Sequence, residues 1–176
     1  DNRFLVKNSE GLWEIYMTES NPHKVGKEYV FASMFHDGIA LVTEVGEPIS
    51  IINTDGEIIK KLDATIDAVR PFSEGYAIYQ RGQYYGILDS KGNKITEDKY
   101  FFITDCSDGK FIALDKKYEN QVKKDYATNV KFDVLDTSGN ILCSLSTNKY
   151  HIYSFVNGKY QEGMLAVYTE SQGELW

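Results

Sequence analysis

Few side chains in this 176-residue chain could carry covalent chemistry, and they are two cysteines and three histidines: Cys106, Cys143, His23, His36 and His151. A thiol beside an imidazole can act as a nucleophile, because the ring accepts the thiol proton. Cys106 with His151 is the one thiol dyad that these residues suggest. However, Cys106 aligns with Phe35 and Phe72 in a repeated motif described below. A position that holds Phe in sister copies is more simply explained as part of the hydrophobic core.

Sequence motifs for metals and cofactors are missing. The chain contains no CxxC pair, no HExxH motif, no GxSxG elbow and no glycine-rich phosphate loop. The segments "NTDGE" and "DSKGN" resemble calcium loops, but Lys91 and Ser138 stand where a further acidic ligand would help. Asp and Glu number 26, so a carboxylate pair at glycosidase separation cannot be picked out. The sequence therefore predicts no catalytic residue, no metal site and no cofactor.

Charge, hydropathy and cysteine content narrow the class of protein. The net charge is −7, which argues against a phosphate backbone as partner, since nucleic-acid binding needs clustered Lys and Arg. No apolar run approaches the ~20 residues that span a bilayer. We therefore expect no nucleic-acid partner and no membrane insertion. We expect two buried free thiols, with a single Cys106–Cys143 bridge as the alternative to free cysteines.

Two features favour binding over catalysis. Aromatic residues make up 14% of the chain, and Tyr84 and Tyr153 belong to aromatic clusters that could form a stacking platform for sugars or a patch for a protein. The alternative is that these rings pack between strands. Four lysines lie on one segment of an otherwise acidic chain: Lys116, Lys117, Lys123 and Lys124. This segment is interpreted as a solvated loop or, if functional, as an electropositive docking loop for an acidic partner.

The elements that must position these residues are copies of one unit. A motif of an aromatic residue or Cys, a polar residue, an acid and Gly precedes an apolar run in "FHDGIAL", "FSEGYAI", "CSDGKFIAL" and "YQEGMLAV". A second motif follows in "IINTDGEI", "ILDSKGNKI" and "VLDTSGNIL". Gly38 and Gly75 of the first motif lie 37 positions apart, and Gly56 and Gly92 of the second lie 36 apart. Two independent motifs with one period indicate a tandem repeat.

A third measure is the large residue four positions before the Asp or Asn of the second motif. This residue is Ile49, Tyr85 and Phe132, and Trp13 and Trp176 fit the same role at the two ends. The steps from Trp13 to Trp176 are 36, 36, 47 and 44 positions. We therefore expect one repeat domain over residues 1–176. Its approximate units are 1–36, 37–73, 74–107, 108–161 and a partial 162–176, with an insertion near 115–129.

Each unit is expected to be a meander of three or four β-strands. The runs "GYAIYQ" and "YYGILD" flank "RGQ" and should pair as an antiparallel hairpin, with further strands near "NKI" and "KYFFIT". In "NTDG" and "DSKG" the Asn or Asp and the Gly occupy the first and fourth positions of a type I turn. Strands that are apolar on both faces must be covered on both, so the units should stack on one another. The fold class is all-β, as a twisted or curved array or, alternatively, a small closed ring like a propeller.

The middle copy carries a family resemblance. The succession "FSEGYA", "YYGILDSKGNKI" and "EDKY" resembles the WG-repeat family of bacterial tandem β-repeats. The Trp-Gly pair of that family corresponds here to Trp13-Glu14, Ile49-Ser50, Tyr85-Gly86 and Phe132-Asp133. The resemblance implies tandem all-β units and a non-catalytic binding role, and it transfers no functional residue.

The functional prediction is a non-catalytic scaffold that recognises another protein. A module that binds carbohydrate or cell-envelope material is the alternative, and it requires exposed rings on a common face. A hydrolase is the third class, and it requires a carboxylate pair or the Cys106 dyad in a cleft.

Overall fold

The computed structural model describes residues 2–18, 21–122 and 130–146, together with the backbone of three strands nearer the C-terminus. The described residues form seventeen strands, with a 3₁₀ turn η1 (Lys116–Tyr118) and a short helix α1 (Glu119–Val122) between β12 and β13. The first seven strands are β1 (Arg3–Lys7), β2 (Trp13–Met17), β3 (His23–Tyr29), β4 (Phe31–Ala32), β5 (Ile39–Thr43), β6 (Ser50–Asn53) and β7 (Ile58–Lys61). The next seven are β8 (Ala68–Val69), β9 (Tyr76–Arg81), β10 (Tyr84–Asp89), β11 (Tyr100–Ile103), β12 (Lys110–Asp115), β13 (Lys131–Asp136) and β14 (Ile141–Ser146). The last three are β15 (Tyr160–Gln161), β16 (Met164–Tyr168) and β17 (Gly173–Leu175).

All strand pairs are antiparallel neighbours in sequence, as the meander prediction requires. The sheets have the orders β1-β2-β3, β4-β5-β6-β7, β8 to β14, and β15-β16-β17. Within the seven-stranded sheet a single residue pair, Tyr85 with Tyr100, joins β10 to β11. We therefore describe four modules: the first is β1–β3, the second β4–β7, the third β8–β10 and the fourth β11–β14. The predicted "YYGILD" hairpin is the pair β9 and β10, while "NKI" forms only an isolated bridge from Lys94 to Leu88.

Two kinds of turn recur in the modules. In the second motif the Asp89 side chain accepts hydrogen bonds from the backbone N–H of Lys91 and Asn93 at 2.9 and 2.8 Å, and Asn53 and Asp136 make the same pair of bonds. The Asn or Asp of the second motif therefore stabilises its own turn, as expected. The first motif closes hairpins whose two central residues both have positive φ, as in a type I′ turn: Asp37-Gly38, Glu74-Gly75 and Asp108-Gly109.

The core lies between consecutive modules. Along β5, Ile39 and Leu41 pack with the third module, whereas Ala40 and Val42 pack with the first. The third and fourth modules repeat this alternation, because successive side chains of a strand point to opposite faces. Each inner module therefore has a leading face against the module before it and a trailing face against the module after it, which confirms the stacking prediction.

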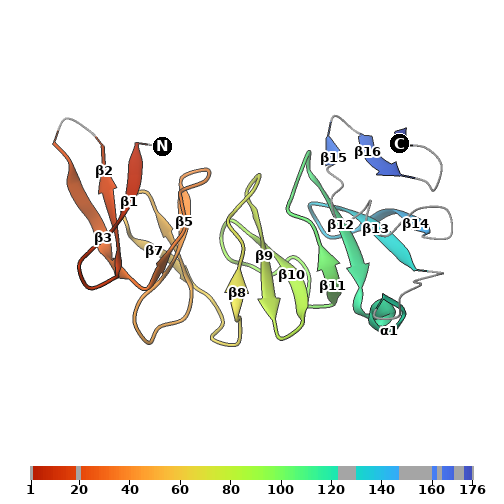
Figure 1. Cartoon of the computed structure of the whole chain (residues 1–176), viewed down its shortest axis with the longest axis horizontal. Coiled ribbons are helices and arrows are strands. Elements are labelled where there is room, and N and C mark those ends of the chain that lie inside the picture. The colour runs from red at the N-terminus through yellow and green to blue at the C-terminus, as the bar shows by residue number, and fades with distance from the viewer. Residues whose placement is uncertain are drawn as a thin grey trace.

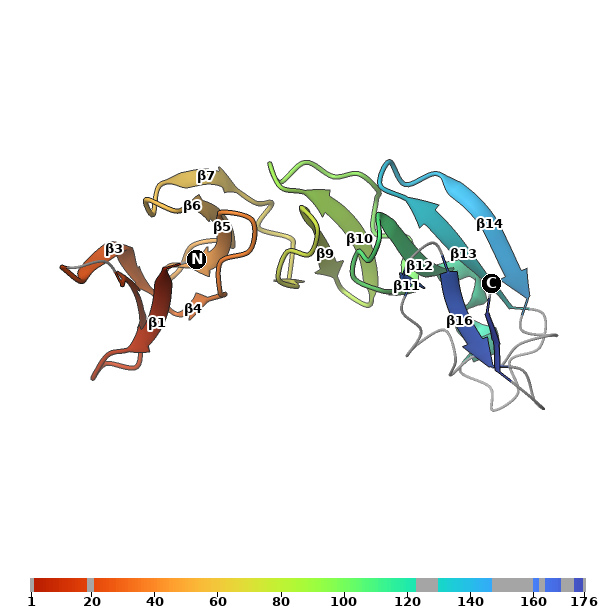
Figure 2. The ribbon, with the colours of Figure 1, turned by 90° about the horizontal axis from the view of Figure 1, so that it is seen from above.

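Stacking of this kind produces an open, curved array. In Figure 1 the modules follow one another from β1 at one end to β14 near the other, and Figure 2 shows the curvature. The described strands do not close into a ring.

The described part of the insertion is not the solvated loop that the sequence suggested. Residues 116–122 form η1 and α1, and Tyr118 and Val122 pack against the apolar cluster on the trailing face of the fourth module. The insertion therefore begins as a packed element.

The cysteines also differ from expectation in one respect. Both are free, and Cys106 is buried among core residues that include Phe111, but Cys143 is exposed on β14. The prediction of two buried thiols was wrong for Cys143, because its strand is the edge of the sheet.

Candidate functional site

A groove opens where the second and third modules meet. It encloses a cavity of about 430 Å³, a size typical of binding pockets. We call it the inter-module groove, and its lining is Phe31, Thr43, Glu47, Pro48, Ile49, Ala64, Ile66, Asp67, Ala68 and Val69. The ring of Phe31 lies at the groove and is 43% exposed, which is unusual for a large aromatic side chain.

Two edge strands border this groove. Phe31 belongs to β4, the first strand of the four-stranded sheet, and Ala68 and Val69 form β8, the first strand of the seven-stranded sheet. The core beneath includes Ile66, Val69 and the trailing face of the second module. The groove thus exists because stacking leaves the ends of two neighbouring sheets side by side.

The charges in the groove are carboxylates. Glu47 accepts a hydrogen bond from Lys61 Nζ at 2.6 Å, and this ion pair lowers the pKa of Glu47. Asp67 accepts from the backbone N–H of Gly82 at 2.6 Å. Within the described part of the chain, no Lys, Arg or His lines the groove.

The tyrosine predicted as a ligand platform, Tyr84, is held by its own chain. Its hydroxyl donates a hydrogen bond to Glu119 at 2.7 Å, and this bond raises the pKa of Tyr84. Lys116 Nζ lies 5.1 Å from the centre of the Tyr84 ring. The structure therefore brings together two of the predicted site residues, Tyr84 and Lys116, but as a contact between β10 and the helical segment.

The remaining predicted residues do not join this cluster in the described structure. Lys117 lies over the ring of Tyr118, 5.0 Å from its centre, and its backbone N–H donates to Asp115 at 2.9 Å. Tyr153, Lys123 and Lys124 lie outside the described residues, so their predicted role stays a prediction.

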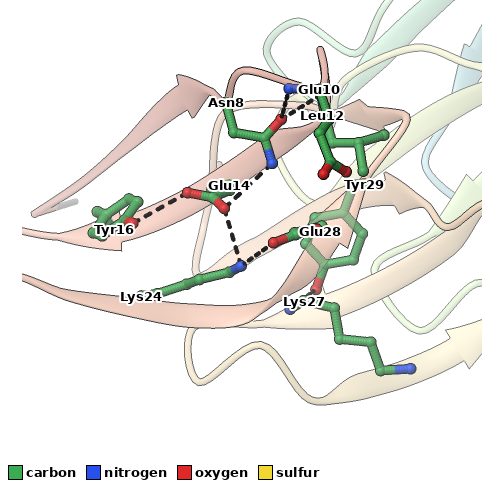
Figure 3. A network of polar contacts seen from close by, with 9 residues as sticks. All are labelled: Asn8, Glu10, Leu12, Glu14, Tyr16, Lys24, Lys27, Glu28 and Tyr29. Carbon is green, nitrogen blue, oxygen red and sulfur yellow. Dashed lines mark hydrogen bonds and ion pairs between the residues drawn. The ribbon is translucent and has the colours of Figure 1, made fainter.

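The leading face of the first module is the second candidate surface. Since Leu5 and Ile15 point toward the second module, Phe4 and Tyr16 point away from it, and their rings stack with centres 5.7 Å apart. Figure 3 shows the polar network on these strands, in which Glu14 binds Lys24 Nζ at 3.1 Å and the Tyr16 hydroxyl at 3.1 Å. The hydrogen bond from Lys24 lowers the pKa of Glu14. In the inner modules the equivalent face is buried and apolar.

The nucleophile hypothesis has little support in the described residues. Cys106 is 4% exposed, and burial raises its pKa to about 12, so the thiol stays protonated at neutral pH. His151 lies outside the described residues. His23 and His36 are exposed, as expected for turn or surface positions.

The described residues form neither a metal-ligand cluster nor a membrane-spanning helix. Among residues 2–18, 21–122 and 130–146, no three His, Cys, Asp or Glu side chains gather as metal ligands. The described part of the chain contains no helix with the length and apolar character needed to cross a bilayer.

Sequence reasoning missed Phe31 and the groove. Phe31 lies in the apolar run "YVFASMF", which indicates a strand but not an exposed ring. The groove joins residues 31–49 to residues 64–69, and the sequence has no signal for that contact.

Two solved structures share the fold of this chain, whereas the curated proteins provide no match. The computationally designed Ika8 protein matches with 9% identity and a TM-score of 0.52, over 100% of this chain and 55% of that one. KlHsv2 with loop 6CD replaced by a Gly-Ser linker matches with 15% identity and a TM-score of 0.53, over 99% of this chain and 58% of that one. The chain thus spans little more than half the length of these proteins, and the likeness concerns the fold.

A family model matches the last two strands of the second module and the chain that follows them as far as β10. The matched residues, 50–85, run from the start of β6 to Tyr85 in β10, so they include the contact between the second and third modules. The chain therefore carries a WG containing repeat over residues 50–85, as the resemblance predicted.

Proposed function

We propose that the protein is a non-catalytic repeat scaffold that recognises another protein through the inter-module groove. The observation that carries this proposal is the exposed Phe31 ring beside an apolar cavity of about 430 Å³. Exposed aromatic side chains next to a pocket are typical anchors of protein interfaces.

Other features support a scaffold over an enzyme. Cys106, which would be the nucleophile, is buried and protonated. The stacked modules form a continuous support, because β5, β9 and β12 each place alternate side chains in two neighbouring cores. Rigid repeat arrays expose long surfaces that suit recognition.

Selection from a random peptide library tests the proposal. The library is selected on the wild-type chain and counter-selected on Phe31→Ser, which removes the ring from a position already 43% exposed. We expect enrichment of peptides whose binding needs Phe31. A library without any Phe31-dependent binder would contradict recognition through this groove.

A carbohydrate-binding role is the second candidate, and the leading face of the first module favours it. The stacked Phe4 and Tyr16 rings supply apolar surface. The polar groups of Glu14, Lys24 and Asn8 beside them supply hydrogen-bonding surface, and Figure 3 shows these three residues with Tyr16. A panel of bacterial and dietary polysaccharides, read by tyrosine and tryptophan fluorescence, tests this role. Binding that is lost in Tyr16→Ala and retained in Tyr84→Ala would favour this face over the predicted Tyr84 platform.

A further inference from the structure

We infer that the inter-module groove takes an extended peptide segment that places a bulky apolar side chain in the cavity and a Lys or Arg beside Glu47 and Asp67. This inference rests on the proposed function and specifies the chemistry of the partner. Three properties of the groove lead to it: its apolar lining, its charge and its bordering strands.

The lining favours an apolar side chain. Ile49, Ile66 and Val69 are apolar, and Phe31 adds an exposed ring at the same opening. Filling such a cavity removes apolar surface of both partners from water, at about 25 cal/mol per Å². A wholly polar ligand would leave this apolar surface without apolar contacts.

The charge of the groove favours a cation. Glu47 and Asp67 are the ionised groups of the lining, and the structure records one donor for each, Lys61 and the Gly82 N–H. A carboxylate offers about four lone-pair positions, so both can accept further hydrogen bonds. Lys61 offsets part of the charge at Glu47, and its side chain is 49% exposed, so it can turn aside into water. The net charge of −7 also opposes an acidic partner.

The bordering strands favour an extended backbone. β4 and β8 are both edge strands, and each pairs with only one neighbour in its sheet. Edge strands present unpaired backbone groups, and extended peptides commonly add to them. Because side chains alternate along an extended segment, an apolar residue in the cavity brings its next neighbours toward the rim.

The test uses three synthetic nonapeptides, capped at both ends, with Leu and Ile at alternate positions. The intervening positions are all Lys, all Gln or all Glu, and each peptide carries a fluorophore for anisotropy titration with the full chain. We expect the Lys peptide to bind about tenfold more tightly than the Gln peptide. We expect no saturable binding of the Glu peptide.

Four variants locate the binding site and the source of the preference. Phe31→Ser should weaken both the Lys and the Gln peptide by about tenfold, because it removes the aromatic anchor. Asp67→Asn and Glu47→Gln should each weaken the Lys peptide alone, by about threefold at low salt. The matched control is Ile59→Ser, since Ile59 is 44% exposed on β7 and does not line the groove. It should bind as the wild type does.

The possible failures separate the two proposals. Equal, Phe31-dependent binding of the Lys and Gln peptides would overturn the inferred basic chemistry and leave recognition through the groove standing. Absence of saturable binding by the Lys peptide would overturn the inference, and the library selection would still decide the proposed function. An equal loss in Ile59→Ser and Phe31→Ser would overturn both, because binding would not belong to the groove.

Discussion

At the scale of single residues, the packing of the neighbouring strand explains why glycine follows Tyr85. Gly86 lies opposite Tyr79 in the register of β10 and β9, and a Cβ on Gly86 would come within 2.4 Å of the Tyr79 ring. The corresponding pair in the second module is Ser50 opposite Val42, and in the fourth it is Asp133 opposite Ala113. The third module thus has the largest side chain of the three on the first strand of the pair, Tyr79, and the smallest residue on the second strand, Gly86. The Gly of the repeat motif is therefore required where a Tyr fills the space across the strand.

Gly86→Ala should be destabilising. The added methyl overlaps the Tyr79 ring, and overpacking of a well-packed core lowers the free energy of unfolding by about 1–3 kcal/mol. Urea unfolding followed by fluorescence measures the change.

A double-mutant cycle checks the cause. In a Tyr79→Val background, Gly86→Ala should lower the free energy of unfolding by much less, because the overlapping ring is gone. The same loss in both backgrounds would show that the ring is not the obstacle.

At the scale of elements, each module is tied to the next by its turns. Gly56, Gly92 and Gly139 lie so close to the preceding module that a Cβ would come within 3 Å of its atoms. Between the third and fourth modules, the Glu74 carboxylate accepts hydrogen bonds from the backbone N–H groups of Asp108 and Gly109 at 2.9 and 2.8 Å. The turns thus close hairpins and also bind neighbouring modules together.

Glu74 should make the free energy of unfolding depend on pH. The bond from Gly109, followed by that from Asp108, lowers the pKa of Glu74 below its ordinary value of 4.5. A lowered folded-state pKa contributes stability that is present above the unfolded value and is lost as the pH falls through the folded-state value. Glu74→Gln should therefore lower the urea midpoint at pH 7 more than at pH 3.5.

A matched control for this measurement is Glu10→Gln, since the structure records no partner for the exposed Glu10 side chain. It should change the midpoint little at either pH. A Glu74→Gln loss that is the same at both pH values would show that the carboxylate charge has no part in the bond.

At the scale of the whole molecule, the leading face of the first module differs from the trailing face of the fourth. The leading face of the first module has Glu14 and Tyr16 where the second module has Ser50 and Ile52, and its polar network suits contact with water. The trailing face of the fourth module is covered in part by Tyr118 and Val122 of the insertion. Among residues 2–18, 21–122 and 130–146, hydrophobic cores join only consecutive modules, so stability should be a sum of local contributions.

Local destabilisation should therefore remain local. Ile15→Ala removes a fully buried side chain from the core between the first and second modules, a change that lowers the free energy of unfolding by about 2–5 kcal/mol. Hydrogen exchange should then show loss of protection in β1 to β6, with β12 and β13 protected as in the wild type.

Phe132→Ala provides the reciprocal measurement, because Phe132 is buried in the fourth module. Hydrogen exchange in this variant should show loss of protection in β12 and β13, with β2 protected as in the wild type. Equal loss of protection along the chain in both variants would show a single cooperative unit instead of a linear array.

Sequence alone predicted the all-β class, most strands of the meander and the repeat, although "NKI" forms only an isolated bridge. Alternating apolar residues, an Asp or Asn in the turn between two strands and glycine at constant spacing are local patterns, and each acts through neighbours in sequence. They predicted the hairpin of β9 and β10, the burial of Cys106 and the stacking of modules. They also predicted that the second motif forms a turn, and its Asp side chains accept hydrogen bonds from backbone N–H groups of their own turns.

Tertiary structure alone decided which surfaces remain exposed. Residue type suggested Tyr84 as a platform, and this stays a prediction; nothing in the sequence indicated its contact with Glu119, 35 positions away in the helical segment. Phe31 gave no signal, yet its ring borders a cavity because residues 64–69, which begin the third module, lie beside it. The physical reason is that burial depends on the summed packing of segments distant in sequence, whereas strands and turns depend on a few adjacent residues.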